Sequence, residues 1–333
     1  MKHRTNIFLI TAAMLFLMLD SRTAISGIIS GLELCIYTII PALFPFLFLS
    51  SLLLNELSGW KSGILHPITA KLGMPLGIEG ILVVGLLGGY PTGAASVASY
   101  YRQKKIDRLQ AERMLGFCNN AGPAFIFGIS SSIFPWYLSL VIWIIHILAA
   151  MLTAYIIQSP QKTIIIMNES TGTTASQVLN NTIRTMAVIC GWIILFRMVI
   201  YVCCQYFLCS LPEVLQVIVQ GILELSNGCC SLNTVTDPTI QFILFSVFIS
   251  LGGICVLMQT ASVAAPLSLR WYIKGKLLQC LISFIISGMA AMALFPTAHL
   301  AGGLMLLLFL GSILLLLTVY VIKNSRFLEK LAV

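Results

Sequence analysis

Charged residues are scarce in this sequence. Asp, Glu, Lys and Arg make up 9% of its 333 residues, whereas a soluble globular chain carries about 25%. Hydrophobic residues reach 59%, so the composition excludes an ordinary soluble domain and predicts an all-α, polytopic transmembrane helical bundle. The net charge of +8 does not indicate nucleic acid as a partner, because the basic residues lie in short connections between apolar runs, as in the cytoplasmic loops of membrane proteins.

Motifs that mark enzymes and ATPases are also missing. No P-loop pattern G-x-x-x-x-G-K-[ST] occurs, so the sequence does not support intrinsic ATP drive. No nucleophile–base pair stands out. The adjacent pairs Cys203-Cys204 and Cys229-Cys230 lack the ligand spacing of a zinc site, and cysteines within apolar runs behave as small hydrophobic residues. We therefore expect no enzyme activity, no cofactor and no metal site.

Apolar runs and basic connections divide the chain into regions. The segments 102–113 and 270–276 are predicted to be cytoplasmic connections. Lys323, Arg326 and Lys330 then form a cytoplasmic tail, and both termini lie inside. The first helix is expected to be retained, although its cleavage as a signal peptide stays open. The regions are an N-terminal transmembrane helix (1–22), a first repeat (23–134), a connecting helix and loop (135–175), a second repeat (176–266), and C-terminal transmembrane helices with the tail (267–333).

The first repeat contains three irregular segments. Prolines 41 and 45 predict a kink within the apolar segment Thr23–Leu54. The segment Gly80–Tyr101 is too short and too broken for two full spans, and a re-entrant hairpin turning near Gly89-Tyr90-Pro91 would return it to the cytoplasmic side. Met114–Phe134 is predicted to cross the membrane, with its helix unwound at Asn119-Asn120 because Pro123 cannot donate to the carbonyl of Asn119.

The second repeat has the same order of elements. After the span Ser176–Cys209, Leu211–Leu232 is predicted to form a second hairpin, and Pro238–Pro266 crosses with a break at Gly252-Gly253. Open backbone persists at membrane depth only where it is buried in protein or lines a polar cavity. The opposite orientations of the two halves predict inverted repeats with substrate bound between them, as in many transporters.

Candidate binding residues in the first half lie at its hairpin tip and its helix break. The tip offers backbone amides to an anion, and the break offers free carbonyls beside two side-chain amides. Tight packing of a glycine-rich tip, and pairing of asparagines between helices, are the structural alternatives. The candidates are Gly89, Tyr90, Thr92, Gly93, Asn119, Asn120 and Gly122.

Candidates in the second half include a charged pair. Arg197 lies deep in an apolar run, where an arginine costs at least about 2.5 kcal/mol, so it needs Glu224, Glu33 or a bound anion as a partner. A structural ion pair, or an arginine that reaches the membrane surface, is the alternative. Arg184 is expected to be an interfacial anchor. The candidates are Arg197, Glu224, Ser226, Asn227, Gln259 and Thr260.

Five motifs stand out in the sequence: Leu43-Phe44-Pro45-Phe46, the run 89–94, the run 118–128, Glu224-Leu225-Ser226-Asn227-Gly228 and Leu251-Gly252-Gly253 to Gln259. They resemble motifs of the sporulation integral membrane protein YlbJ family, which belongs to the nucleoside-recognition or Gate-domain group. The resemblance covers about residues 30 to 265. It implies a multi-pass protein of a bacterial inner membrane, either of the cell or around the forespore, linked to moving dipicolinate. It also implies a layout similar to concentrative nucleoside transporters, with two opposed hairpins and two unwound helices.

Together, these features favour a carrier of a small anionic metabolite, with dipicolinate as the candidate. The first hairpin lacks evident carboxylates for a nucleoside ribose, whereas Arg197 and the glycine-rich tip suit a dianion better. The alternatives are a non-transporting sporulation membrane scaffold, or a nucleoside or cation transporter. Membrane lipid is an expected partner, while a coupling proton or cation and a homo-oligomer both stay open.

Overall fold

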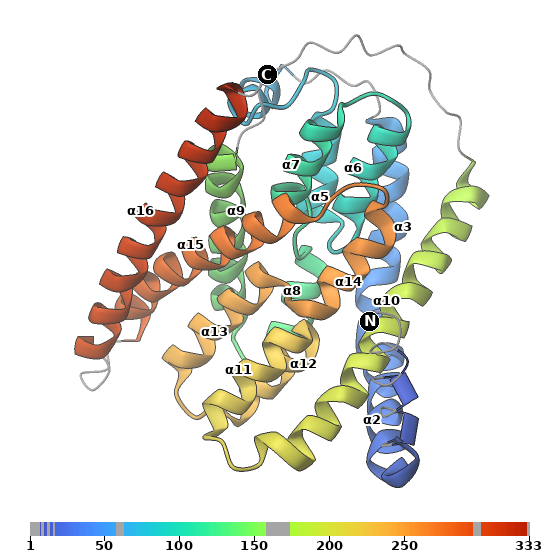
Figure 1. Ribbon diagram of the computed structural model, residues 1–333, viewed down its shortest axis with the longest axis vertical. Helices are drawn as coiled ribbons and strands as arrows, with labels where there is room; N and C mark the ends of the chain where they lie inside the picture. Colours follow the sequence, from blue (N-terminus) through green and yellow to red (C-terminus); the bar gives the residue numbers. More distant parts are fainter. Residues whose placement is uncertain are drawn as a thin grey trace.

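The computed structural model describes residues 7, 10, 11, 14, 15, 17–57, 63–157, 174–295 and 301–331. These residues form helices and connections, with no strand among them (Figure 1). Six helical stretches within the described part are long and apolar enough to cross a membrane, which confirms the predicted polytopic helical bundle. The six are Ser21–Glu56, Trp136–Ile157, Ala175–Leu208, Pro238–Ala264, Arg270–Leu294 and Gly303–Ile322.

Three predictions fall on residues that the structure does not describe, or describes only in part. Half of the predicted helix 1–22, and residues 158–173 of the predicted connecting helix and loop (135–175), lie outside the described residues. The predicted tail continues helix α16 (Ala301–Leu331), and the side chains of Lys323, Arg326 and Lys330 lie outside the described set.

The first long span accommodates its prolines by a local change of helix type. Helix α2 (Ser21–Leu34) passes through a π-helical turn, η1 (Cys35–Ile39), into α3 (Ile40–Glu56). The ring of Pro41 would press on the carbonyl of Tyr37, and a wider turn relieves that contact. The predicted irregularity is therefore present, one turn before Pro41.

Small residues hold this span against helix α10 (Ala175–Cys203), which ends in the π-helical turn η2 (Cys204–Leu208). A side-chain carbon on Gly27 would lie 2.8 Å from the Cα of Met198, and one on Gly31 would lie 2.9 Å from the Cα of Ile194. Glycines four residues apart let two membrane helices approach closely. Figure 1 shows α2 and α10 side by side at one edge of the molecule.

The basic segments are more helical than predicted. Helix α7 (Arg108–Cys118) starts at a capping box, in which Gln110 N donates to Asp107 Oδ1 at 2.8 Å and Asp107 N donates to Gln110 Oε1 at 3.2 Å. Helix α15 begins at Arg270 and runs to Leu294. The predicted connections 102–113 and 270–276 are therefore not loops over 108–113 and 270–276, which are helical. Charged side chains within these stretches are held inside the bundle by neighbouring helices.

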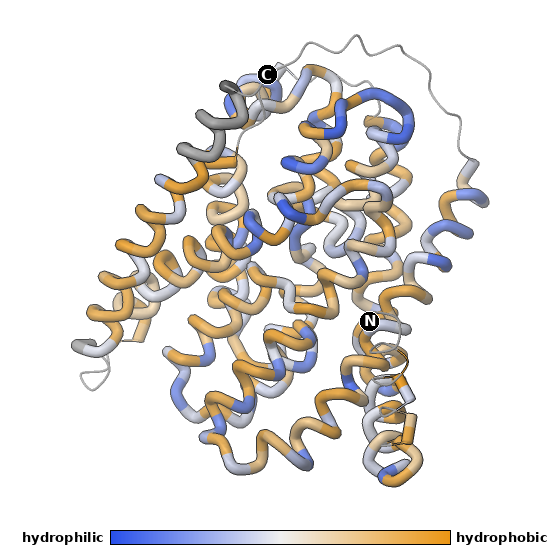
Figure 2. Tube along the Cα trace, in the orientation of Figure 1, coloured by the Kyte–Doolittle hydropathy of each residue, from blue (hydrophilic) through white to orange (hydrophobic). Residues whose placement is uncertain are grey.

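Two of those charges are buried. The side chain of Arg113 is 4% exposed, and its guanidinium lies 4.7 Å from the ring centroid of Trp271 in α15. Lys276 is 2% exposed. The connection between α6 (Thr92–Arg102) and α7 keeps its exposed charges and is one of the hydrophilic stretches in Figure 2.

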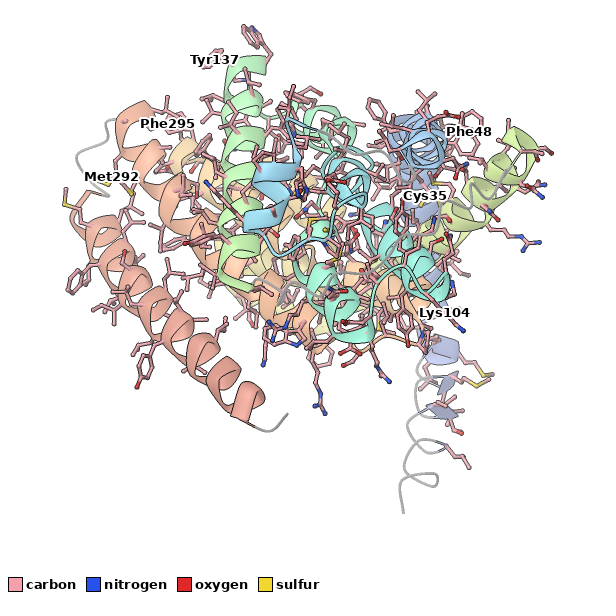
Figure 3. The ribbon with its side chains drawn as sticks, turned by 90° about the horizontal axis from the view of Figure 1, so that it is seen from above. Cys35, Phe48, Lys104, Tyr137, Met292 and Phe295 are labelled. Carbon is pink, nitrogen blue, oxygen red and sulfur yellow. The ribbon has the colours of Figure 1, made fainter. Side chains whose placement is uncertain are left out.

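The α6–α7 connection and the α14–α15 connection lie on one face of the molecule. Ser268 N donates to Glu112 Oε1 at 3.0 Å, and Arg102 Nη1 donates to the carbonyl oxygen of Ala265 at 3.4 Å. Figure 3 shows Lys104 of this face and Tyr137, near the start of α9 (Trp136–Ile157), at opposite edges. The two predicted basic regions therefore share a side, as the topology requires.

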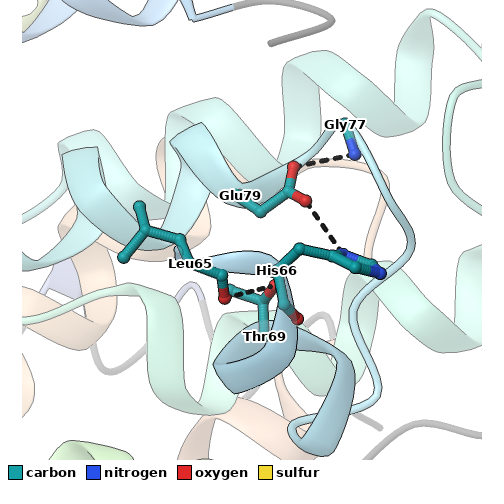
Figure 4. A network of polar contacts seen from close by, with 5 residues as sticks. All are labelled: Leu65, His66, Thr69, Gly77 and Glu79. Atoms are coloured by element: carbon teal, nitrogen blue, oxygen red, sulfur yellow. Dashed lines mark hydrogen bonds and ion pairs between the residues drawn. The ribbon is translucent and has the colours of Figure 1, made fainter. Parts of the chain in front are cut away.

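A buried carboxylate anchors the entry to the first hairpin (Figure 4). Glu79, at the start of α5 (Glu79–Leu87), is fully buried. Its Oε2 accepts from Gly77 N at 2.7 Å, and its Oε1 lies 3.0 Å from Nδ1 of His66 in α4 (His66–Lys71). These contacts satisfy the carboxylate inside the protein and fix α4 against the first turn of α5.

Candidate functional site

The first predicted hairpin is formed by α5 and α6. The helices are in contact, and residues 88–91 make the turn between them. Gly89 has φ +80°, which glycine adopts without strain. The predicted interruption of the 80–101 segment is confirmed.

The first helix break lies between α7 and α8 (Pro123–Ser130). Asn119 and Gly122 are extended, with φ/ψ of −116°/99° and −80°/159°. The predicted unwinding at Asn119-Asn120 is confirmed, and a short helix lies on each side of it. Helix α7 starts at Arg108, earlier than the predicted Met114, and α8 ends at Ser130.

Backbone contacts seat the hairpin on this break. A side-chain carbon added to Gly85 or Gly93 would overlap the carbonyl oxygen of Cys118. One added to Gly122 would lie 2.9 Å from Gly89 N. Ala94 N also donates to Asn119 Oδ1 at 3.3 Å. The glycines at these positions are therefore required by close packing.

The second half repeats this arrangement with different residues. Helices α11 (Glu213–Leu223) and α12 (Leu225–Ser231) meet at the extended residue Glu224. Its carboxylate accepts from Ser226 N at 3.0 Å and from Asn227 N at 2.6 Å, and so caps α12. The α12 helix packs back on α11, as predicted for a hairpin.

The second break consists of two consecutive glycines with positive φ, Gly252 at +79° and Gly253 at +75°. Helix α13 (Pro238–Leu251) ends before Gly252, and α14 (Gly253–Ala264) follows. A side-chain carbon on Gly253 would lie 2.9 Å from the carbonyl oxygens of Gly221 and Ile222 in α11. The predicted break at Gly252-Gly253 is confirmed, and it too lies against the preceding hairpin.

Side-chain hydrogen bonds join the two halves. Tyr90 Oη donates to the carbonyl oxygen of Ile249, three residues before Gly252, at 3.1 Å. Asn119 Nδ2 donates to Thr260 Oγ1 at 3.0 Å. Each bond runs from the first half to the broken helix of the second.

A small cavity lies at this junction. Its volume is about 20 Å³, which is room for about one water. Five predicted site residues line it together with apolar side chains from α3, α8 and α10. The five are Tyr90, Gly122, Glu224, Ser226 and Gln259.

Other predicted residues support this junction without lining the cavity. Thr92 Oγ1 donates to the carbonyl oxygen of Gly88 at 3.4 Å, and Asn120 Nδ2 donates to that of Phe117 at 2.7 Å. The other predicted site residues that support the junction through the contacts described above are Gly89, Gly93, Asn119 and Thr260.

Arg197 lies at a separate, more open hollow of about 480 Å³ between α2, α10, α11 and α12. Arg22 and Asn227 line the same hollow. Arg197 Nε donates to Ser30 Oγ at 3.1 Å, and the described residues show no ion pair between Arg197 and Glu224. The predicted pairing of these two charges is therefore not formed.

An acidic residue, Asp20, is hydrogen-bonded to Thr23, which lines this hollow. Asp20 precedes α2 and accepts from Tyr206 Oη at 2.7 Å and from Thr23 N at 3.2 Å. These hydrogen bonds, that of Tyr206 first, lower the pKa of the Asp20 carboxyl. Among the described residues that line the hollow, two are arginines, Arg22 and Arg197, and none is a carboxylate.

Lys276 joins the junction although the sequence analysis assigned it to a loop. Its Nζ donates to Asn120 Oδ1 at 3.1 Å and to Gln279 Oε1 at 2.7 Å. The same atom lies 5.0 Å from the ring centroid of Tyr90. A polar stripe on an otherwise apolar helix was the available signal, since Lys276, Gln279 and Ser283 are spaced for one helix face.

Comparison with known proteins gives one partial likeness. The protein named "Sporulation integral membrane protein YlbJ" of Bacillus subtilis (strain 168) is 33% identical over 101 residues, which are 30% of this chain. The match covers 25% of the relative's length, so the chain spans a quarter of the curated relative that it matches. No family model matches the chain, and no solved structure matches it.

Proposed function

We propose that this chain is a membrane carrier for a small anionic metabolite, with dipicolinate as the first candidate. One observation carries the proposal: Tyr90 and Gly122 of the first half and Glu224, Ser226 and Gln259 of the second line one buried cavity, beside both helix breaks. Open backbone and buried polar groups are costly inside a membrane protein. Carriers use such groups to bind substrate near the middle of the membrane.

Inverted repeats are part of this proposal. In each half a hairpin packs by glycine backbone on the broken helix that follows it. The two halves can move apart first on one side of the membrane and then on the other, which would open the junction to each side in turn. A cavity of about 20 Å³ is too small for a pyridine dicarboxylate, so the geometry corresponds to a closed state that must open to load substrate.

Positive charge supports an anion as substrate. Arg22 and Arg197 line the outer hollow, and Lys276 lies in the closed junction. Glu224, at the cavity, is the proposed site for a coupling proton or cation. The segments at 102–105 and 265–270 are proposed to face the cytoplasm, together with both termini.

The relative's name supports a role in sporulation. Its printed name describes a sporulation integral membrane protein, and we extend that setting to this chain. The proposed location is a bacterial inner membrane, either of the cell or around the forespore.

Reconstituted transport tests the proposal. Purified protein in proteoliposomes is loaded with unlabelled dipicolinate and given labelled dipicolinate outside, with protein-free liposomes as the control. We expect counterflow that unlabelled dipicolinate inhibits and uridine does not. Inhibition by uridine alone would indicate a nucleoside carrier, and absence of any counterflow would favour a scaffold. Normal spore dipicolinate content in a strain that lacks the protein would remove the sporulation role.

A further inference from the structure

Lys276 carries a buried amine whose hydrogen-bond partners are all neutral. Both oxygens that it contacts, Asn120 Oδ1 and Gln279 Oε1, belong to amides. Among the residues that the structure describes, no carboxylate lies within ion-pair distance of its amine. Burying an ammonium group costs several kcal/mol unless a counter-charge compensates it.

The orientation of Asn120 is fixed toward this amine. Asn120 Nδ2 donates to the carbonyl oxygen of Phe117 at 2.7 Å, which leaves its Oδ1 facing Lys276. Asn120 belongs to the first helix break, and its neighbour Gly122 lines the cavity. The break therefore contacts the Lys276 amine through Asn120 and the cavity through Gly122.

Tyr90 contacts the Lys276 amine and also lines the cavity. The distance between Nζ and its ring centroid is 5.0 Å. The same residue bonds Ile249 through its hydroxyl. A movement of the first hairpin that breaks the Tyr90–Ile249 bond would also move the ring that contacts the amine.

We propose that Lys276 binds a carboxylate of the transported anion, and that Tyr90 covers this amine in the closed state. This assignment rests on the proposed carrier function and adds to it the residue that recognises the charge. The third ammonium proton, directed at neither amide oxygen, is then available to the substrate. A carboxylate at that position supplies the counter-charge that the protein itself does not bring to Lys276.

Two probes of the same shape test the assignment. Dipicolinate carries two carboxylates, whereas pyridine-2,6-dicarboxamide is neutral. The binding of each to detergent-purified protein is measured by calorimetry for the wild type, Lys276→Gln and Lys276→Arg. A hydrogen bond to a charged group is worth about 1.5–3 kcal/mol, so we expect Lys276→Gln to weaken dipicolinate binding roughly ten- to a hundredfold. Lys276→Arg should retain part of the affinity, and binding of the dicarboxamide should change less than twofold.

A second variant covers the case in which Lys276→Gln does not fold. Asn120→Asp places a carboxylate at the atom that now contacts the amine at 3.1 Å. The new ion pair stabilises Lys276 and competes with the substrate, so dipicolinate should again bind at least tenfold more weakly. Asn233→Asp, on the exposed turn after α12, is the matched control and should bind as the wild type does.

The outcomes separate this inference from the proposed function. If Lys276→Gln and Asn120→Asp bind dipicolinate as tightly as the wild type does, the Lys276 assignment is wrong and the carrier function stands. Equal losses for dipicolinate and the neutral dicarboxamide would make Lys276 a structural residue. If the wild type neither binds nor exchanges dipicolinate, the proposed function fails, and the assignment fails with it.

Discussion

Tyr90 Oη, at the tip of the first hairpin, donates a hydrogen bond of 3.1 Å to the carbonyl oxygen of Ile249 in the broken helix of the other half. The acceptor lies just before Gly252, where the helix ladder stops. A hairpin that reaches across the molecule in this way ties the position of one half to that of the other. The bond is therefore expected to favour the closed junction.

Removing this hydroxyl should loosen the junction without disturbing its packing. Tyr90→Phe keeps the ring beside Lys276 and deletes one hydrogen bond, which costs about 1 kcal/mol. We expect a lower unfolding temperature in detergent than for the wild type. Tyr137→Phe, at an exposed position on α9, is the control and should leave that temperature unchanged. Equal unfolding temperatures for the two variants would show that the Ile249 contact does not stabilise the fold.

The glycine contacts predict an abrupt loss of folded protein. A methyl group at Gly93 meets the carbonyl oxygen of Cys118, which is backbone and cannot turn away. Gly93→Ala should therefore abolish a monodisperse gel-filtration peak after detergent extraction. Gly191→Ala, on α10, has open space around the new methyl group and should behave as the wild type. A normal peak for Gly93→Ala would mean that the hairpin can sit farther from the break.

Arg197 should affect the capture of substrate more than the fold. Arg197→Gln removes one of two arginines that line the outer hollow. A solvent-accessible charge contributes up to about 1 kcal/mol, so we expect the KM for dipicolinate uptake to rise about two- to fivefold. Arg184→Gln, at an exposed position on the same helix, is the matched control. Unchanged uptake at equal expression would remove Arg197 from the substrate path.

Glu224 is predicted to couple transport to a second ion. Glu224→Gln keeps one acceptor oxygen for the amides that now bind its carboxylate, so the cap of α12 weakens by about 1 kcal/mol. The variant should still exchange labelled for unlabelled dipicolinate across liposomes. Accumulation driven by a proton gradient should be lost, because the side chain can no longer bind and release a proton. Gradient-driven accumulation equal to that of the wild type would exclude Glu224 as the proton site.

The shared face of the two basic connections gives a topology test. Lys104 and Arg270 are exposed, and each belongs to or borders a connection on the same face. In a background without the native cysteines, Lys104→Cys and Arg270→Cys should react with a membrane-impermeant maleimide only in inside-out vesicles. Tyr137→Cys should react only in right-side-out vesicles. Reaction of Lys104→Cys and Arg270→Cys from opposite sides would contradict this topology.

The sequence predicted the backbone irregularities better than the charges. Proline and glycine act through their own geometry, so the breaks near Asn119 and Gly252 and the turn at Gly89 could be located without tertiary information. The burial of Arg113 and Lys276 depends on which helices surround them. Both lie in clusters of basic residues, which are typical of exposed loops. In the folded chain, Arg113 contacts the ring of Trp271 and Lys276 contacts the amide of Asn120, so both are buried within helices.

The separation of Arg197 from Glu224 could not be predicted for a related reason. Each is a charge in an apolar context, and pairing is the simplest way to satisfy both. In the folded chain, the amides at the start of α12 satisfy the carboxylate, and Ser30 accepts a hydrogen bond from the guanidinium. Local backbone geometry at residue 224 provides what a distant arginine was expected to provide.

Substitutions at contacts within each half and at contacts between the halves should have different effects in a mutational scan. Hairpin and broken helix touch backbone to backbone at Gly85, Gly93 and Gly253, so every replacement there introduces atoms into occupied space and should score as null. Across the seam, Tyr90 and Asn119 act through side chains, and replacements should score along a gradient of residue size and polarity. A plot of the tolerance to substitution along the chain should thus distinguish the contacts within each half from the contacts between the halves.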